Sequence, residues 1–307
     1  MNWQQCIPML AGLILAPLIL GIINRTKAIF AGRHGSPLLQ AYYDIFKLLG
    51  KGAVYSRTTT WVFRASPSVC LASVIVAMAV VPIPGVASAP VSFAGDIILF
   101  AYCLGLMRFF IVVAALDTGS AFEGMGASRE VQFSALAEPA FIIGLATLAR
   151  QTGSLSLSGV FSGLSMTAWQ AVGPALALVA VALLLVFLAE NSRIPVDDPN
   201  THLELTMIHE VMILDYSGPD LAFVLYAASL KLWVFGALIV SVLLSALGLE
   251  GMAAIGGFYA GMVVLAVLVG VIESTMARLS LLKVPQMLVG AGALSVLAFT
   301  LVVRFTS

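Results

Sequence analysis

The sequence has few charged residues. Asp, Glu, Lys and Arg make up 10% of its 307 residues, whereas hydrophobic residues make up 61%. Soluble domains carry about 25% charged and about 45–50% apolar residues. So few charges cannot cover a water-exposed surface, and we expect a lipid bilayer to be the main solvent. The 15 basic and 15 acidic residues cancel, and without a basic excess we expect no nucleic-acid partner.

Cysteine and the common catalytic motifs are also scarce. The three cysteines, Cys6, Cys70 and Cys103, lie far apart in apolar surroundings and form no CxxC pair, so we expect no metal site and no cofactor in this chain. The sequence contains no Walker loop and no GxSxG elbow. Residues 1–5 contain no Lys or Arg ahead of the first apolar run, which indicates a retained first helix rather than a cleaved signal.

Long apolar stretches dominate what is present. Spanning a bilayer takes about 20 apolar residues in a helix, because every backbone polar group must then be paired within the segment. Such stretches occur at 7–24, 67–86, 96–116, 131–150, 169–189, 221–247, 254–277 and 284–304. The sequence therefore predicts an all-α integral membrane protein, a bundle of about eight transmembrane helices in a single domain over residues 1–307.

The basic residues are distributed unevenly between the two sides of such a bundle. If the spans alternate, eleven Lys and Arg residues fall on one side and only Arg150 and Arg304 on the other. Because basic loops stay in the cytoplasm, both termini are predicted outside, with long cytoplasmic loops at 25–66 and 190–220. The outward loops, among them 151–168, are nearly free of charge.

Four ionisable residues lie inside the apolar stretches: Arg108, Glu138, Lys231 and Glu273. Each would cost about 2.5–3.5 kcal/mol in contact with lipid, so they are expected to face protein or water. One interpretation is a hydrated polar path that carries protons; the other is a set of ion bridges that fix helix packing. Glu123 and Glu130 can share one broad helix face with Glu138. We favour the path, because four buried charges and an acidic loop would otherwise serve only packing.

The loop at 190–220 contains seven acidic residues and two histidines, His202 and His209. Seven residues along a helix are about 10.5 Å, too far for both histidines to bind one metal ion at about 2.1 Å. An amphipathic interfacial helix over residues 200–215 is the preferred interpretation of this segment.

Three segments carry a family resemblance, and they read GRHGSPLLQAYYDIFKLLGK (32–51), DTGSAFEGMGASRE (117–130) and ENSRIPVDDPNTHLELT (190–206). They resemble the subunit 1 (H-type) proteins of respiratory complex I and their relatives in membrane-bound nickel–iron hydrogenases. The segment at 117–130 resembles the hydrogenase branch, which includes formate hydrogenlyase.

The resemblance implies a non-catalytic subunit that anchors a hydrogenase in a prokaryotic cytoplasmic (inner) membrane and couples it to ion movement. It implies contacts with large and small (iron–sulfur) hydrogenase subunits, which would hold the nickel–iron centre and the clusters, and with antiporter-like membrane subunits. The expected partner interface comprises Arg33, Gln40, Asp44, Lys47 and Tyr216. The expected proton pathway comprises Glu123, Glu130, Glu138, Glu190, Asp197, Glu204, Glu210, Asp215, Lys231 and Glu273, with Arg108, Arg129 and Arg193 tuning their charge.

Two alternative functions stay open at this point. One is a quinone-binding subunit of a complex I-like NADH dehydrogenase. The other is a stand-alone ion transporter.

Overall fold

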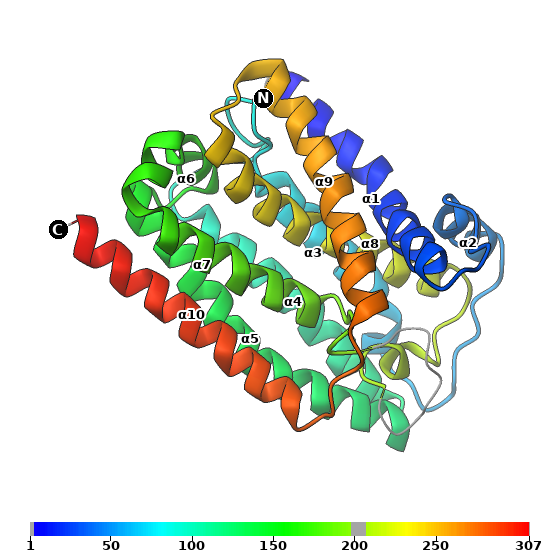
Figure 1. Ribbon diagram of the computed structural model, residues 1–307. Helices are drawn as coiled ribbons and strands as arrows, with labels where there is room; N and C mark the ends of the chain where they lie inside the picture. The colour runs from blue at the N-terminus through cyan, green and yellow to red at the C-terminus, as the bar shows by residue number, and fades with distance from the viewer. Residues whose placement is uncertain (1–2, 198–206, 307) are drawn as a thin grey trace.

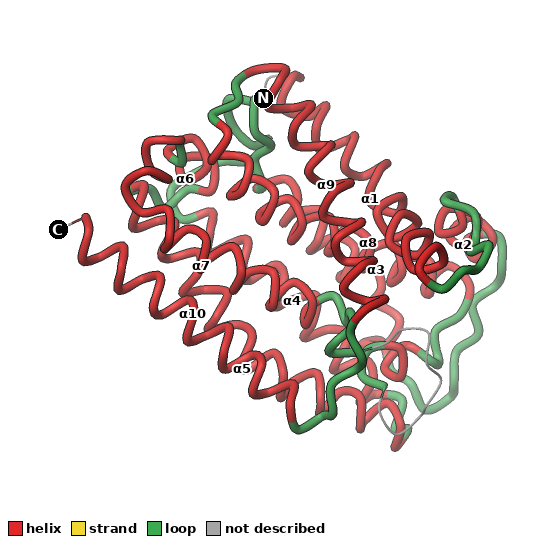
Figure 2. The backbone as a smooth tube through the Cα atoms, in the orientation of Figure 1, coloured by secondary structure: helices red, strands yellow, loops and turns green. Residues whose placement is uncertain are grey.

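A bundle of long helices makes up the protein (Figure 1). The computed structural model describes residues 3–197 and 207–306, and within these ranges the regular structure is entirely helical (Figure 2). The eight long helices are α1 (Trp3–Phe30), α3 (Trp61–Val80), α4 (Asp96–Asp117), α5 (Ala121–Thr152), α7 (Met166–Glu190), α8 (Gly218–Leu244), α9 (Gly251–Thr275) and α10 (Lys283–Thr306). All eight are long and apolar enough to cross a membrane, which confirms the predicted fold class.

Two helices begin well before the predicted apolar stretches. Helix α3 covers Trp61–Val80 rather than 67–86, because Pro82 and Pro84 follow it and the residue before a proline is disfavoured in a helix. Helix α5 begins ten residues before the predicted stretch at 131–150. Its first turns contain charged side chains, which lower the hydropathy without disturbing the helix.

Short helices lie in segments expected to be loops. Helix α2 (Gln40–Leu49) lies within the loop at 25–66, and α6 (Leu157–Gly163) within the outward loop at 151–168. The predicted interfacial helix at 200–215 is wrong where the structure describes it: only a 3₁₀ turn, η1 (Glu210–Ile213), is present. Its Val211 and Met212 are buried, because the segment folds into the protein instead of lying on the membrane surface.

Helix α8 is the most deeply buried span: 78% of the residues in its most apolar segment are buried inside the protein. It packs against α1, α2, α3, α7 and α9. On one side of it α5, α7 and α10 lie together, and on another α1 lies beside α9 (Figure 1). A helix that is mostly surrounded by protein can hold polar side chains at lower cost than its neighbours.

Prolines inside two spans free backbone carbonyls that tyrosine hydroxyls then bind. Pro17 has no N–H for the carbonyl of Leu13, and the hydroxyl of Tyr226 on α8 donates to that oxygen at 2.9 Å. Pro67 leaves the carbonyl of Phe63 free, and Tyr216 donates to it at 3.0 Å. In a bilayer an unpaired carbonyl is costly, so these two bonds tie α1 and α3 to the α8 region.

We predict that Tyr216→Phe destabilises the protein while leaving its helices in place. The ring would still stack on Phe63, whose centroid lies 4.1 Å away, so the substitution removes only the hydrogen bond to the freed carbonyl. We expect a loss of about 1–3 kcal/mol in the free energy of unfolding in detergent. Tyr102→Phe is the matched control, because Tyr102 is exposed. Equal stability of the two variants would contradict the assignment.

Candidate functional site

Arg108, in the middle of α4, is the centre of a buried ionic cluster. Its Nη2 lies 2.6 Å from Oε1 of Glu190 at the end of α7, and its Nη1 donates to Oε1 of Glu138 on α5. Its Nε lies 3.7 Å from Oε1 of Glu130, which precedes Glu138 by about two turns of α5. Three helices are thus joined through one guanidinium, whose fixed planar fork suits several carboxylates at once.

Glu190 also binds the only lysine of α8. Nζ of Lys231 lies 2.9 Å from Oε2 of Glu190, and both side chains are less than a tenth exposed. A carboxylate held between a guanidinium and an ammonium is stabilised in its charged form. Glu190 therefore joins the Arg108 cluster to the central helix.

Glu273 is the centre of a second cluster at the end of α9. Its side chain is fully buried. Its carboxylate lies 2.8 Å from Nζ of Lys27 on α1 and 3.5 Å from Nη1 of Arg193 in the segment after α7. Two cations therefore share one carboxylate here.

A cavity of about 360 Å³, called the large cavity below, borders both clusters: Glu190 and Lys231 of the first and Arg193 of the second line it. Its walls come from α1, α2, α8 and the segment after α7, and its polar lining includes Glu190, Lys231, Arg193, Asp197 and His209. We call the series from Glu138 through Arg108, Glu190, Lys231 and Arg193 to Glu273 the polar axis.

The segment after α7 is held in place by Asp197. Its carboxylate accepts from the backbone N–H groups of Ile208 and His209 at 3.1 and 3.2 Å, and it binds Arg278 at 2.8 Å. Gly126 of α5 permits this packing, because a Cβ there would lie 2.8 Å from the carbonyl of Ile208. The predicted charge-tuning residue Arg129 donates to the carbonyl of Met207 at 3.0 Å, on the same segment.

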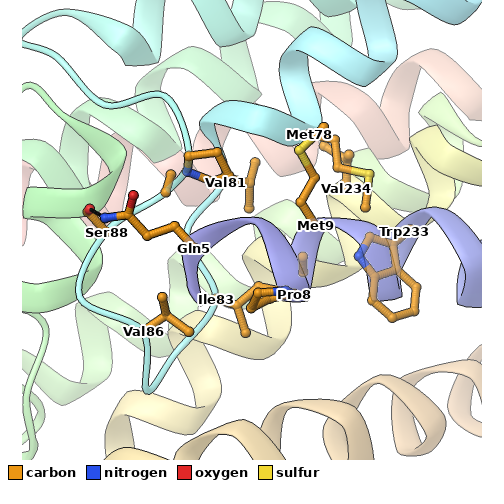
Figure 3. Close-up of a pocket in the computed structure, with 13 residues that line it drawn as sticks. Gln5, Pro8, Met9, Met78, Val81, Ile83, Val86, Ser88, Trp233 and Val234 are labelled. Carbon is orange, nitrogen blue, oxygen red and sulfur yellow. Dashed lines mark hydrogen bonds between the residues drawn. The ribbon is translucent and has the colours of Figure 1, made fainter. Parts of the chain in front are cut away.

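Beyond Lys231 the interior is apolar. Residues 232–240 of α8 are buried and carry no ionisable side chain. The cavity in Figure 3, between α1, α3 and α8, is only about 20 Å³, room for roughly one water molecule. Its polar side chains Gln5 and Ser88 bind each other at 2.8 Å, so this cavity is too small and too well paired to be a ligand site.

The other predicted site residues lie outside the polar axis or at its edge. Glu123 is buried at the start of α5 and accepts from the N–H of Asp215 at 3.1 Å, while the side chain of Asp215 is exposed. Glu210 lines the large cavity. Glu204 lies outside the described residues.

The predicted interface residues divide into three places. Gln40 donates to Asp44 on α2 at 2.8 Å, Asp44 also lines the cavity, and Lys47 is exposed on the same helix. Arg33 lies in a separate open pocket between α1 and α9. Tyr216 is only 4% exposed, because it packs on α3.

Lys27 and Arg278 were missed as members of the site. Both were counted only as loop charges that set the orientation of the chain. Each nevertheless binds an acid from a distant part of the sequence, Glu273 and Asp197. No local motif predicts such a pair. The only signal in the sequence is that a buried acid such as Glu273 requires a cation as a partner.

Metal binding finds no geometric support in the part of the chain that the structure describes. Within residues 3–197 and 207–306, no three His, Cys, Asp or Glu side chains are grouped so that they could hold an ion. The residues of the polar axis instead pair carboxylates with cations: Arg108 binds Glu138 and Glu190, Lys231 binds Glu190, and Arg193 lies 3.5 Å from Glu273.

The bundle and its buried ion pairs define a multi-pass membrane protein with a polar interior. A family model described as NADH dehydrogenase matches residues 5–304. The chain belongs to this family, in which complex I subunit 1 is found, as the sequence motifs had predicted.

Two relatives from Escherichia coli (strain K12) are similar over most of their length. Formate hydrogenlyase subunit 4 is 32% identical over 305 residues, which cover 95% of this chain and 96% of the relative. Hydrogenase-4 component C is 34% identical over 232 residues, 76% of this chain and 72% of the relative. These likenesses confirm the predicted resemblance to the hydrogenase branch.

A solved structure shares the fold. The membrane-bound sulfane sulfur reductase, an archaeal respiratory membrane complex, contains a chain that matches with a TM-score of 0.79 at 16% identity, over 98% of both chains. At this identity the match bears on the fold alone.

We predict that His209 makes the protein sensitive to acid. Burial, together with the nearby charge of Lys231, lowers its pKa from 6.5 to about 4. Below pH 6.5 the imidazole of His209 binds a proton in the unfolded chain but not in the folded chain. The folded protein therefore loses stability as the pH falls from about 6.5 to about 4. The side chain is partly exposed, so we expect a loss of about 1–2 kcal/mol.

Unfolding in detergent at pH 7.5 and pH 5 measures this effect. His209→Gln should lose less stability between the two values than the wild type. His34→Gln, at an exposed site, is the control and should behave as the wild type. An unchanged pH dependence in His209→Gln would refute the assignment.

We predict that Arg108→Met destabilises the bundle by about 3–5 kcal/mol, because it leaves the carboxylate of Glu190 buried with one cation fewer. The double variant with Glu190→Gln should lose less than the sum of the two single losses, because both single substitutions break the same ion pair. Arg150→Met, at an exposed site, is the control. The measurement is the free energy of unfolding of the two single variants and the double variant. If the loss in the double variant equals the sum of the two single losses, Arg108 and Glu190 are not coupled.

Proposed function

We propose that the chain anchors a formate hydrogenlyase-like, group 4-type nickel–iron hydrogenase and links its redox arm to a proton or ion pathway in the membrane. The observation that carries this proposal is the position of Glu138. Its side chain is 50% exposed in the middle of α5, yet its carboxylate binds the buried Arg108. The polar axis thus reaches the lateral surface of the bundle, toward the membrane.

Protons enter the axis from the inner side. The large cavity is bordered by the segment after α7 and by α2, and it contains His209, Asp197 and Glu210. Nε of Arg193 is buried without a protein hydrogen bond, and buried polar atoms of this kind usually bind water. A hydrated cavity next to Glu190 allows protons to reach that carboxylate from the cytoplasm.

The path then leaves sideways rather than straight across the membrane. Residues 232–240 of α8 contain no ionisable side chain, and the polar side chains of the small cavity beside them, Gln5 and Ser88, bind each other. An ionised side chain facing lipid costs several kcal/mol, so a neighbouring membrane subunit covers Glu138 in the complex. The proposed neighbour is antiporter-like and continues the path.

The peripheral arm docks on the inward loops. Gln40, Asp44 and Lys47 of α2 form one polar edge of this surface, and the large and small hydrogenase subunits carry the nickel–iron centre and iron–sulfur clusters. The complex lies in the prokaryotic cytoplasmic (inner) membrane with both termini of this chain outside. The hydrogenase names of the two E. coli relatives support this assignment.

We predict that Glu138→Gln uncouples the complex without preventing its assembly. The amide keeps the shape and the hydrogen bond to Arg108 but cannot accept and release a proton at this point of the axis. In proteoliposomes containing the whole complex, proton movement per hydrogen formed should fall at least tenfold, by analogy with other lost proton-transfer groups.

The matched control is Glu250→Gln, at the exposed start of α9 on the other side of the bundle. It should leave proton movement unchanged. An assembled Glu138→Gln complex with unaltered proton movement would overturn the proposed role.

Quinone binding is the second candidate, because the large cavity reaches the range of about 300–1,000 Å³ typical of small-molecule sites. It predicts quinone-dependent electron transfer that quinone-site inhibitors block. Stand-alone ion transport is less well supported, since a lone chain would leave Glu138 facing lipid.

A further inference from the structure

An open pocket lies where α1 and α9 end on the inner side. It is next to the large cavity, and Asn24 lines both. Its volume is about 500 Å³, and its lining includes Lys27, Phe30, Arg33, Glu273 and Ser274. The polar axis reaches this opening only at Glu273, and the proposed docking surface on α2 does not include any residue of its lining.

The pocket carries more positive than negative charge. Glu273 is its one acidic residue, and that carboxylate is already shared between Lys27 and Arg193. Lys27 and Arg33 are the two cations of the lining, and no ion pair to Arg33 is found among residues 3–197 and 207–306. The imbalance favours an anion, and a free guanidinium suits a phosphate group in particular.

The backbone holds Arg33 over the pocket. Its N–H donates to the carbonyl of Ala28 at 2.9 Å, at the turn that Gly32 makes with a φ of +63°. Gly35 lies so close to α1 that a Cβ would meet the Cβ of Ala28 at 2.4 Å. The segment that carries Arg33 is therefore folded back on the end of α1. Its backbone is already ordered, so that ligand binding costs little conformational entropy of the loop.

Both helices that border this pocket carry exposed apolar side chains. On α1, Ile29 and Phe30 are more than half exposed beside it, and on α9 the side chains of Val264 and Leu268 are exposed along the span. The two helices lie side by side (Figure 1). An occupant with an anionic head and apolar chains matches both features, whereas a soluble anion would match only the first.

We propose that this pocket binds the phosphate of an anionic phospholipid of the inner leaflet. Arg33 and Lys27 hold the head group, and the acyl chains lie along the exposed faces of α1 and α9. Basic pockets between spans on the cytoplasmic side are suited to such lipids. Arg33 then serves as a lipid ligand rather than as a contact for the peripheral arm.

Native mass spectrometry of the full chain in detergent tests this proposal. The chain is titrated with phosphatidylglycerol or with phosphatidylcholine of the same acyl chains. We expect phosphatidylglycerol to bind more tightly, and Arg33→Gln to weaken it about tenfold, as the loss of a charge-assisted hydrogen bond implies. Arg33→Lys keeps the charge and should lose less.

Arg57→Gln is the matched control, because Arg57 is exposed in the other part of the same inward loop and does not line the pocket. It should change the affinity less than twofold, which is small beside the effect expected for a direct ligand. Equal effects of the two Arg→Gln variants would overturn the proposal.

Two further measurements exclude other occupants. Inorganic phosphate that displaces phosphatidylglycerol at millimolar concentration would show a site for soluble anions and would overturn the lipid assignment. If Arg33→Gln left lipid binding intact but removed the peripheral subunits from the purified complex, the pocket would be a protein contact. The proposed proton path through Glu138 would survive either result, because it does not use Arg33.

Discussion

The guanidinium of Arg108 determines where three of the eight long helices stand. It binds the carboxylates of Glu138 and Glu190 and lies near Glu130, so α4, α5 and α7 meet at one charge. Moving such a group out of water is expensive, and only close, well-oriented carboxylates offset the cost. The geometry of the surrounding helices is therefore constrained by the need to keep these contacts.

The paired charges are also separated from an apolar stretch of α8. Cations and carboxylates border a cavity of about 360 Å³, whereas beyond Lys231 residues 232–240 of α8 are buried and carry no ionisable side chain. Charges are tolerated where they are paired and reached by water, and they are absent from the part of α8 that seals the membrane. Glu138 extends the polar axis to the lateral surface of the bundle, because its side chain is half exposed while its carboxylate binds Arg108.

Much of the architecture follows from local properties of the chain. Eight apolar stretches became eight long helices, because a bilayer leaves the backbone no other way to pair its polar groups. The errors occurred where two demands compete: α5 is longer than its apolar stretch because charged side chains near its start find protein partners. Likewise, the residues at 207–213 follow the pattern of a surface helix, yet they are buried against α5 through Gly126.

The sequence by itself determined the number of spans, the all-helical fold, the family and the presence of charges that must avoid lipid. All of these depend on composition or on short motifs. Only the tertiary structure decided the partners: Lys27 with Glu273, Arg278 with Asp197, and Glu138 at the lateral surface. Ion pairs between residues far apart in the chain leave no trace in local sequence, because their energy depends on distances that exist only after the helices have packed.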